Sequence, residues 1–194
     1  MQKHAKPRVA IIGCGGMGRA HAQALLAFGG LELVAAADPF AEPRAAMKKA
    51  ANSIQLYENA NDMLERERPN LVVVATAAAH HRDLVIAALH GGAHVLCEKP
   101  FSVTLAEADE MLAVAQETGR MLLVDHQFRI NPRVQACLRL VREGALGDVL
   151  SMEMIHGAFE SHFQGGNRMT LPLERRDHPL ERRLPRQIKE TVTT

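Results

Sequence analysis

The sequence predicts an α/β protein whose first 125 residues form a Rossmann-type, doubly wound parallel sheet. Short runs rich in β-branched residues alternate with helical segments, and the expected strands are apolar throughout. A glycine-rich turn joins the first of these strands to the first helix. Repeated strand–helix–strand units give parallel strands through right-handed crossovers. Continuously apolar strands fit a sheet that helices cover on both faces.

The elements follow from local patterns in chain order. Turn and capping residues mark several boundaries: Gly29 ends the first helix, Thr104 and Glu107 form a capping box, Gly119 closes the next helix, and Asn131 precedes a helix that runs to about residue 143. We expect strands at 9–12, 33–36, 71–75, 94–97 and 121–124, and helices near 17–28, 41–51, 84–90 and 105–118.

Composition bounds the function. The chain has 194 residues, is 47% hydrophobic and carries a formal net charge of +1. It therefore has enough apolar residues for a core, and no large field to steer it to nucleic acid or to a membrane surface. No apolar run reaches the ~20 residues that span a bilayer. Three cysteines without a close pair predict neither a disulfide framework nor a metal site, so we expect a cytoplasmic protein.

The character of the sequence changes after residue 125. Residues 126–157 resemble the beginning of a second α/β domain, with an alternating strand at 148–157. Residues 158–194 lack a steady hydrophobic period and contain two copies of the segment Pro-Leu-Glu-Arg-Arg, which predicts a disordered tail. A basic arm that binds nucleic acid is the alternative for this tail. Its acidic residues dilute the charge, and it has no aromatic residue after Phe163 for base stacking.

The segment from Gly13 to Gly18, Gly-Cys-Gly-Gly-Met-Gly, matches the pattern G-x-G-x-x-G between a strand and a helix. In this context Gly13 permits a tight turn, Gly15 lets a pyrophosphate approach the backbone, and Gly18 lets the helix pack against the strand. The amides of Gly16 and Met17 then face the phosphates at the positive end of the helix dipole.

Asp38 lies twenty residues beyond Gly18, at the end of the second expected strand. A carboxylate at this spacing accepts hydrogen bonds from the ribose hydroxyls of a dinucleotide. It would also repel a 2′-phosphate, so the sequence favours NAD over NADP. Arg44 lies close enough in sequence to soften that preference.

Two further strands end in polar segments on the same edge of the predicted sheet. The run Val-Val-Val-Ala-Thr76 leads to His80 and His81, and the strand at 94–97 leads into Glu98-Lys99-Pro100. Ligands bind at this edge in open α/β sheets. A lysine there could stabilise the negative charge that develops on a substrate oxygen during hydride transfer.

Together these motifs resemble the Gfo/Idh/MocA oxidoreductases, which include glucose–fructose oxidoreductase and inositol 2-dehydrogenase. The resemblance covers residues 6–157. It implies that Lys99 is the catalytic lysine beside substrate and nicotinamide, that Glu98 belongs to the same cofactor-binding signature, and that a cis bond precedes Pro100. It also implies that Thr76 and His80 line the nicotinamide side. The segment His126-Gln127-Phe128-Arg129 matches the start of the second domain, where the resemblance places Gln127 and Arg129 near the cofactor.

The resemblance ends soon after the strand at 148–157, so we expect a chain truncated within its second domain. The usual acid/base histidine has no counterpart, because Asp177 and His178 are adjacent rather than four residues apart. Two functions stay open. The first is an NAD-dependent oxidoreductase that acts on a sugar or polyol. The second is a cofactor-binding module without turnover, which would pair with a longer relative, and homo-oligomer formation stays open as well.

Overall fold

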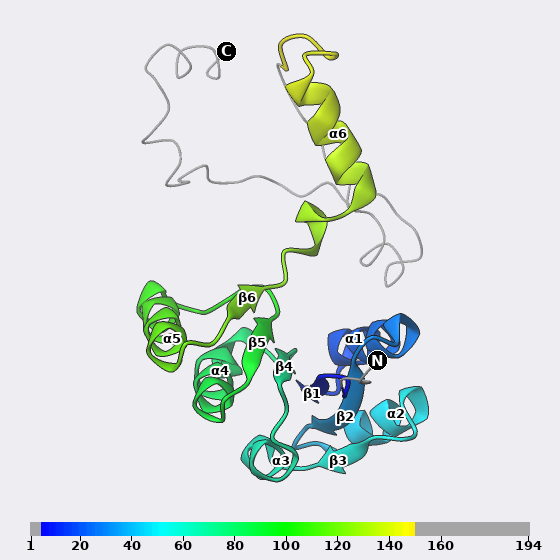
Figure 1. Ribbon diagram of the computed structural model, residues 1–194, viewed down its shortest axis with the longest axis vertical. Helices are drawn as coiled ribbons and strands as arrows, with labels where there is room; N and C mark the ends of the chain where they lie inside the picture. Colours follow the sequence, from blue (N-terminus) through cyan, green and yellow to red (C-terminus); the bar gives the residue numbers. More distant parts are fainter. Residues whose placement is uncertain (1–4, 150–194) are drawn as a thin grey trace. The chain divides into compact units, whose positions relative to one another are not determined.

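A six-stranded, wholly parallel sheet organises residues 5–149, which are the residues that this computed structural model describes (Figure 1). The strand order is β3-β2-β1-β4-β5-β6. From β1 the chain adds β2 and β3 on one side and then adds β4, β5 and β6 on the other, so the order of addition reverses between β1 and β4. This is the doubly wound arrangement, and ligands bind at its reversal point. The predicted fold class is therefore confirmed. The tail at 158–194 and nearly all of the strand expected at 148–157 lie outside the described residues.

The bounds of most elements agree with the expected ones. The helix α4 begins earlier than expected, and β3 and α3 were not expected at all. The strands are β1 (Arg8–Ile12), β2 (Glu32–Ala37), β3 (Gln55–Tyr57), β4 (Leu71–Val74), β5 (His94–Cys97) and β6 (Leu122–Val124). The helices are α1 (Gly16–Phe28), α2 (Ala41–Ala50), α3 (Ala60–Glu67), α4 (His81–His90), α5 (Leu105–Thr118) and α6 (Pro132–Arg142), with the 3₁₀ turns η1 (Ala78–His80) and η2 (Gln127–Arg129).

Each face of the sheet has its own hydrophobic core, because successive strand residues point to opposite faces. In β1, Val9 and Ile11 pack with Ala22 of α1 and Met47 of α2. Their neighbours in β1 point the other way and pack with Met63, Leu64, Val85 and Met111 from α3, α4 and α5. Figure 1 shows the same division, with α1 and α2 on one side of the sheet and α3, α4 and α5 on the other.

The expected helix boundaries are formed by the predicted caps. Thr104 accepts a hydrogen bond from the Glu107 amide, and the Glu107 carboxylate accepts one in return from the Thr104 amide, which completes the capping box of α5. Gly29 and Gly119 adopt left-handed φ angles of 66° and 63° at the ends of α1 and α5. The Asn131 side chain accepts a hydrogen bond from the Arg133 amide at the start of α6.

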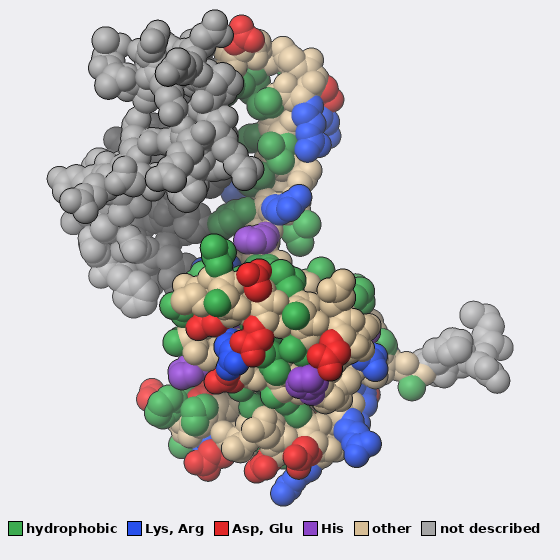
Figure 2. Space-filling model, turned by 90° about the vertical axis from the view of Figure 1, so that its left-hand side faces the viewer, with side chains coloured by type: hydrophobic (Ala, Val, Ile, Leu, Met, Phe, Trp, Pro, Cys, Tyr) green, Lys and Arg blue, Asp and Glu red, His purple; other side chains and the backbone are tan. Residues whose placement is uncertain are grey.

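The chain divides into two compact units, Met1–Arg139 and Leu140–Thr194. The sheet and the residues discussed below belong to the first unit. Acidic, basic and histidine side chains are interspersed on the face that includes α5 (Figure 2). Arg82 of α4 binds Glu110 of α5 through two hydrogen bonds. Among residues 5–149, none of the helices has the length and apolar character that crossing a bilayer requires.

Candidate dinucleotide-binding site

The glycine turn after β1 is shaped by two glycines that have no room for a side chain. Gly13 has a φ of +101°, and a Cβ there would lie 2.5 Å from the Ala75 carbonyl oxygen. A Cβ on Gly18 would lie 1.9 Å from the carbonyl oxygen of Gly13. Gly13 therefore brings the turn against the segment after β4, and Gly18 brings α1 against the turn. Both predicted structural roles agree with this geometry.

Gly15 and Gly16 differ, because a Cβ on either would meet no atom within 4 Å. Gly15 has a φ of −67°, which any residue adopts without strain. The fold itself thus does not require glycine at position 15. It is the N-cap of α1, its helix has no acidic residue in the first turn, and no side chain caps the helix start. Open space before uncapped amides fits an anionic group such as a pyrophosphate.

Asp38 follows β2 directly, and its carboxylate lies against the glycine turn. One oxygen accepts a hydrogen bond from the Cys14 amide at 2.9 Å, and the other accepts one from the Phe40 amide at 2.9 Å. Arg44 donates to the backbone carbonyl of Asp38 at 2.6 Å. The carboxylate is thereby fixed beside the turn, and each oxygen keeps a lone pair for a further donor such as a ribose hydroxyl.

Cys14 lies in the turn as well, but its sulfur is no nucleophile. Burial, followed by the charge of Asp38, raises the pKa of the Cys14 thiol to about 12. A thiol with such a pKa stays protonated at neutral pH, and the thiolate is the reactive form. The contribution of Cys14 to the site is therefore its amide.

Lys99 lies in an exposed segment after β5, and the peptide bond between Lys99 and Pro100 is cis, as the resemblance implied. Lys99 shares a pocket of about 420 Å³ with the segment from Asp125 to Arg129, which includes Gln127 and Arg129. The structure thus brings together three predicted residues from two separate parts of the sequence. This pocket lies at the carboxyl ends of β5 and β6, the edge at which open α/β sheets bind ligands.

Thr76 and His80 follow β4, and their neighbour His81 has the more constrained environment. His80 is exposed at the end of η1, whereas His81 is fully buried. The His81 ring lies 3.0 Å from the carbonyl oxygen of Thr76 and 3.3 Å from that of Phe101. His81 therefore joins the segment after β4 to the segment after β5.

Cys97 completes the contacts of His81. Its sulfur lies 3.3 Å from Nδ1 of His81, and burial, followed by the charge of Glu98, raises the pKa of this thiol to about 12. The protonated thiol can donate to Nδ1 while Nε2 donates to the Thr76 carbonyl. Each ring nitrogen of the buried imidazole then has a hydrogen-bond partner.

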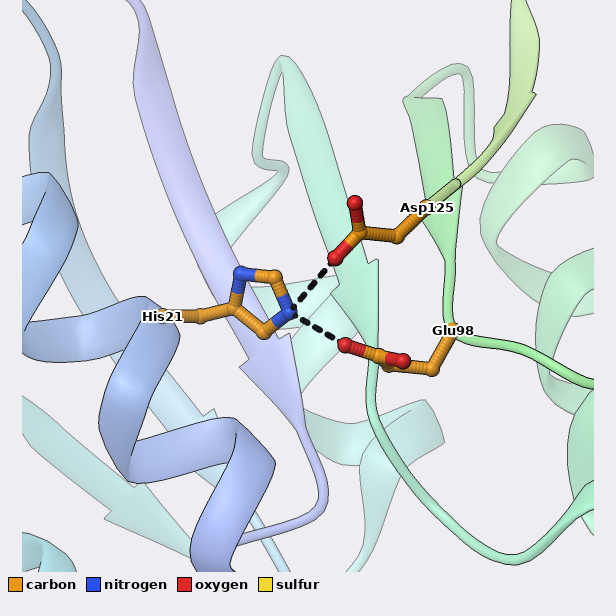
Figure 3. A group of neighbouring side chains, drawn as sticks. All are labelled: His21, Glu98 and Asp125. Carbon is orange, nitrogen blue, oxygen red and sulfur yellow. Dashed lines mark hydrogen bonds and ion pairs between the residues drawn. The ribbon is translucent and has the colours of Figure 1, made fainter. Parts of the chain in front are cut away.

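Glu98 points away from solvent and toward α1. The residue is only 4% exposed, and one oxygen of its carboxylate lies 2.9 Å from Nε2 of His21 (Figure 3). The same nitrogen lies 3.6 Å from a carboxylate oxygen of Asp125, the residue after β6. Burial, followed by the charge of Glu98, raises the pKa of Asp125, and His21 partly opposes this shift.

Four residues of this edge were not predicted as site residues: His21, His81, Cys97 and Asp125. A signal existed for His21, because it lies three residues after Gly18 and therefore shares the helix face that packs on the sheet. Asp125 directly follows an expected strand, as Glu98 does, and Asp38 directly follows β2. The His81–Cys97 contact carries no comparable local signal.

A doubly wound parallel sheet with a glycine turn after β1 and an acid after β2 defines a dinucleotide-binding domain of the Rossmann type. Residues 7–126 match the family model described as "Oxidoreductase family, NAD-binding Rossmann fold". The chain therefore belongs to the Gfo/Idh/MocA family of oxidoreductases.

Known proteins with similar sequence or structure include dehydrogenases and reductases of sugars and polyols. The chain is 40% identical to D-apiose dehydrogenase from Paraburkholderia graminis over 138 residues, which are 71% of this chain and 37% of that protein. A crystal structure of myo-inositol 2-dehydrogenase from Lactobacillus plantarum superposes with a TM-score of 0.70 at 26% identity, over 75% of this chain and 43% of that one. A 3-ketoreductase from Actinomadura kijaniata, solved with TDP-benzene and NADP, gives 0.68 at 28% identity, over 75% and 45% of the two chains.

These coverages show that the chain spans less than half the length of the three relatives. The family description names NAD, and one relative was solved with NADP. The comparisons therefore establish a nicotinamide dinucleotide domain, with the choice between the two dinucleotides left to the residues of the site.

Proposed function

We propose that this chain binds NAD(H) and belongs to an oxidoreductase that transfers a hydride between the nicotinamide and a carbon of a sugar or polyol. The observation that carries the proposal is that the glycines of the turn differ in whether the fold itself requires them. Gly13 and Gly18 are required by backbone contacts, whereas the space beside Gly15 is open. A bound pyrophosphate gives that open space a function.

Asp38 supports NAD rather than NADP as the dinucleotide. Its carboxylate lies beside the turn and is held there by the Cys14 and Phe40 amides. A 2′-phosphate placed beside this charge would be repelled. Arg44, the nearby cation, donates to the Asp38 carbonyl and approaches Glu58 at 3.9 Å, so it is engaged within the fold.

Lys99 is the residue proposed to act on the substrate. A nicotinamide held beside Lys99, Gln127 and Arg129 would accept the hydride that the substrate carbon loses, and the hydroxyl proton would pass to solvent water as the carbonyl forms. The ammonium of Lys99 would stabilise the negative charge on the reacting oxygen. The relatives' substrates, a sugar and an inositol, support a polyhydroxylated substrate. The free, buried thiols of Cys14 and Cys97 support a reducing, intracellular location within the same proposal.

NADH fluorescence titration of the purified 194-residue chain tests the binding step. Gly15→Ala is expected to weaken NADH affinity by about tenfold or more, equivalent to roughly 1.4 kcal/mol, with an unchanged melting temperature, because its Cβ enters only the open space. Asp38→Asn is expected to weaken NADH binding and to narrow the preference over NADPH. Asp62→Asn on the exposed surface of α3 is the control.

Turnover is tested separately with a panel of sugars and polyols. Lys99→Met removes the ammonium but keeps the backbone amide that binds Glu98, so it is expected to abolish turnover and leave NADH affinity within about twofold of the parent chain. Binding without turnover in the parent chain would support the cofactor-binding module instead. If the chain binds neither NADH nor NAD⁺, or if Gly15→Ala binds as the parent does, the proposal is wrong.

A further inference from the structure

The cluster of His21, Glu98 and Asp125 connects three elements that are distant in the sequence. His21 comes from the second turn of α1, Glu98 follows β5 and Asp125 follows β6, and all three side chains converge on one point (Figure 3). Nε2 of His21 lies 2.9 Å from Oε1 of Glu98 and 3.6 Å from Oδ2 of Asp125. The side chains of His21 and Asp125 are each 17% exposed, and that of Glu98 is 5% exposed.

A cluster of this kind needs a reason, because buried carboxylates are costly unless they are paired. The His21 imidazole supplies the pairing for Glu98, and the side chain of Asp125 approaches the same ring nitrogen. The backbone anchors the two acids, since the Glu98 amide donates to the Val74 carbonyl and the Asp125 amide donates to the Cys97 carbonyl. The ring of His21 is therefore the link from α1 to the ends of β5 and β6.

Glu98 also binds the backbone of Lys99, and so connects His21 to the lysine segment. Its second oxygen, Oε2, lies 3.2 Å from the Lys99 amide nitrogen, which donates to it. Both oxygens of the carboxylate are thus engaged, one by His21 and the other by the backbone of the lysine segment. Fixing the Glu98 side chain from α1 restricts where the backbone of Lys99 can lie.

We propose that His21 is a positioning residue that holds Glu98, and through Glu98 the Lys99 backbone, in place for the nicotinamide half of the cofactor site. This inference rests on the proposed function, which places the nicotinamide near Lys99. The adenosine half depends on other groups, namely the glycine turn and Asp38. His21 is therefore expected to affect the two halves of the dinucleotide differently.

A metal ion is the competing explanation, since the three side chains offer ligand atoms that lie within 4.8 Å of one another. The 2.9 Å contact between His21 and Glu98 favours a direct hydrogen bond, in which the nitrogen donates to the carboxylate. An ion bound between these atoms would replace that hydrogen bond. Direct contact is therefore the arrangement on which the proposal is built.

The test compares NADH with ADP-ribose, which has the adenosine, pyrophosphate and second ribose but no nicotinamide. His21→Phe keeps a planar ring and loses the nitrogen that contacts both acids, and His21→Gln keeps a donor. His90→Phe, at an exposed histidine of α4, is the matched control. Dissociation constants for both ligands are measured by calorimetry with the full 194-residue chain, and the Lys99 amide is followed by NMR in lysine-labelled protein.

We expect His21→Phe to weaken NADH binding about tenfold, to leave ADP-ribose binding within about twofold, and to shift the Lys99 amide resonance with faster hydrogen exchange. His21→Gln should restore most of the NADH affinity. Equal losses for both ligands would show a general role in the stability of α1 and overturn the proposal, and so would unchanged NADH affinity. Should His21→Phe fail to fold, His21→Asn, whose amide falls short of Glu98, carries the same expectations.

Two further outcomes separate the alternatives. Stoichiometric binding of Zn²⁺ or Mn²⁺ to the parent chain that His21→Phe abolishes would identify a metal site and overturn the positioning role. Failure of the parent chain to bind either NADH or ADP-ribose would refute the proposed function. Binding of both by every variant with the parent affinities would refute only the role of His21.

Discussion

Gly18→Ala is the substitution whose cost the structure defines most closely. A Cβ at residue 18 would lie 1.9 Å from the Gly13 carbonyl oxygen and 3.0 Å from its carbon, although real Cβ atoms essentially never approach within 3.0 Å. Relief of the oxygen contact therefore requires a movement of about 1.1 Å. The contacted atoms belong to the backbone, so no side-chain rotation provides it, and α1 and the turn must move apart.

The magnitude combines two opposing terms. Overpacking a rigid site costs about 1–3 kcal/mol, and the upper end applies here because backbone meets backbone. Replacing glycine by alanine in a helix returns up to about 1 kcal/mol of helix propensity. We therefore expect a net loss of about 2 kcal/mol in the free energy of unfolding, which corresponds to a melting temperature about 4–8 °C lower for a domain of this size.

Urea denaturation and differential scanning calorimetry measure this loss, with Gly16→Ala as the control. Gly16 is the first residue of the same helix, and a Cβ there meets no atom within 4 Å. The control should unfold within about 0.5 kcal/mol of the parent chain. A Gly18→Ala chain as stable as Gly16→Ala would refute the close approach of α1 to the turn on which the site geometry depends.

Three further expectations concern the residues around the site. His81→Phe should lower the free energy of unfolding by about 2–3 kcal/mol, because the Thr76 carbonyl loses its buried partner. His80→Phe, at the exposed neighbour, should change it by less than about 0.5 kcal/mol. Urea denaturation of both variants measures the difference, and equal effects would contradict the structure. The pKa of Asp125 is raised above its ordinary 3.8 chiefly by burial, so the folded state binds this proton more tightly than the unfolded state does. The associated stability is lost as pH rises through the folded pKa. Asp125→Asn should therefore flatten the fall in the free energy of unfolding above pH 4, and parallel pH profiles for the two chains would refute this. Cys137 is the exposed cysteine of the three, so a thiol-reactive dye should label one thiol in the native chain and three in denaturant. Labelling of more than one native thiol would show that Cys14 and Cys97 are not both buried.

The fold was predictable where the sequence contains local capping and turn residues. Both ends of α5 were predicted because a capping box opens the helix and Gly119 closes it. The elements β3 and α3 were missed for the opposite reason. The strand has three residues, only one of them aliphatic, and α3 is dominated by polar residues. This helix is held by the Asn59 cap and by burial of Met63 and Leu64, and the burial is a tertiary effect that its period alone does not reveal.

The residues of the site also differ in how far local sequence predicts them. The glycine turn and Asp38 were predicted because each is defined by its own position relative to one strand, and the parallel sheet places the strand ends together. The partnership of His21 with Glu98 spans 77 residues. It arises because α1, which follows β1, packs on one face of the sheet and contacts β4, and β5 and β6 lie next to β4 in the strand order. Predicting it needs the order of the strands as well as their bounds.

The strand order also explains why the proposed halves of the cofactor site should respond separately to substitution. The groups assigned to the adenosine half follow β1 and β2, which are neighbours on one side of the reversal point, and those assigned to the nicotinamide half follow β4, β5 and β6 on the other side. The contact of Gly13 with the Ala75 carbonyl joins the two sides at the backbone, and His21 joins them through side chains. Because the first connection is rigid backbone and the second depends on one ring nitrogen, a substitution at His21 can loosen the Lys99 segment while the glycine turn keeps its shape.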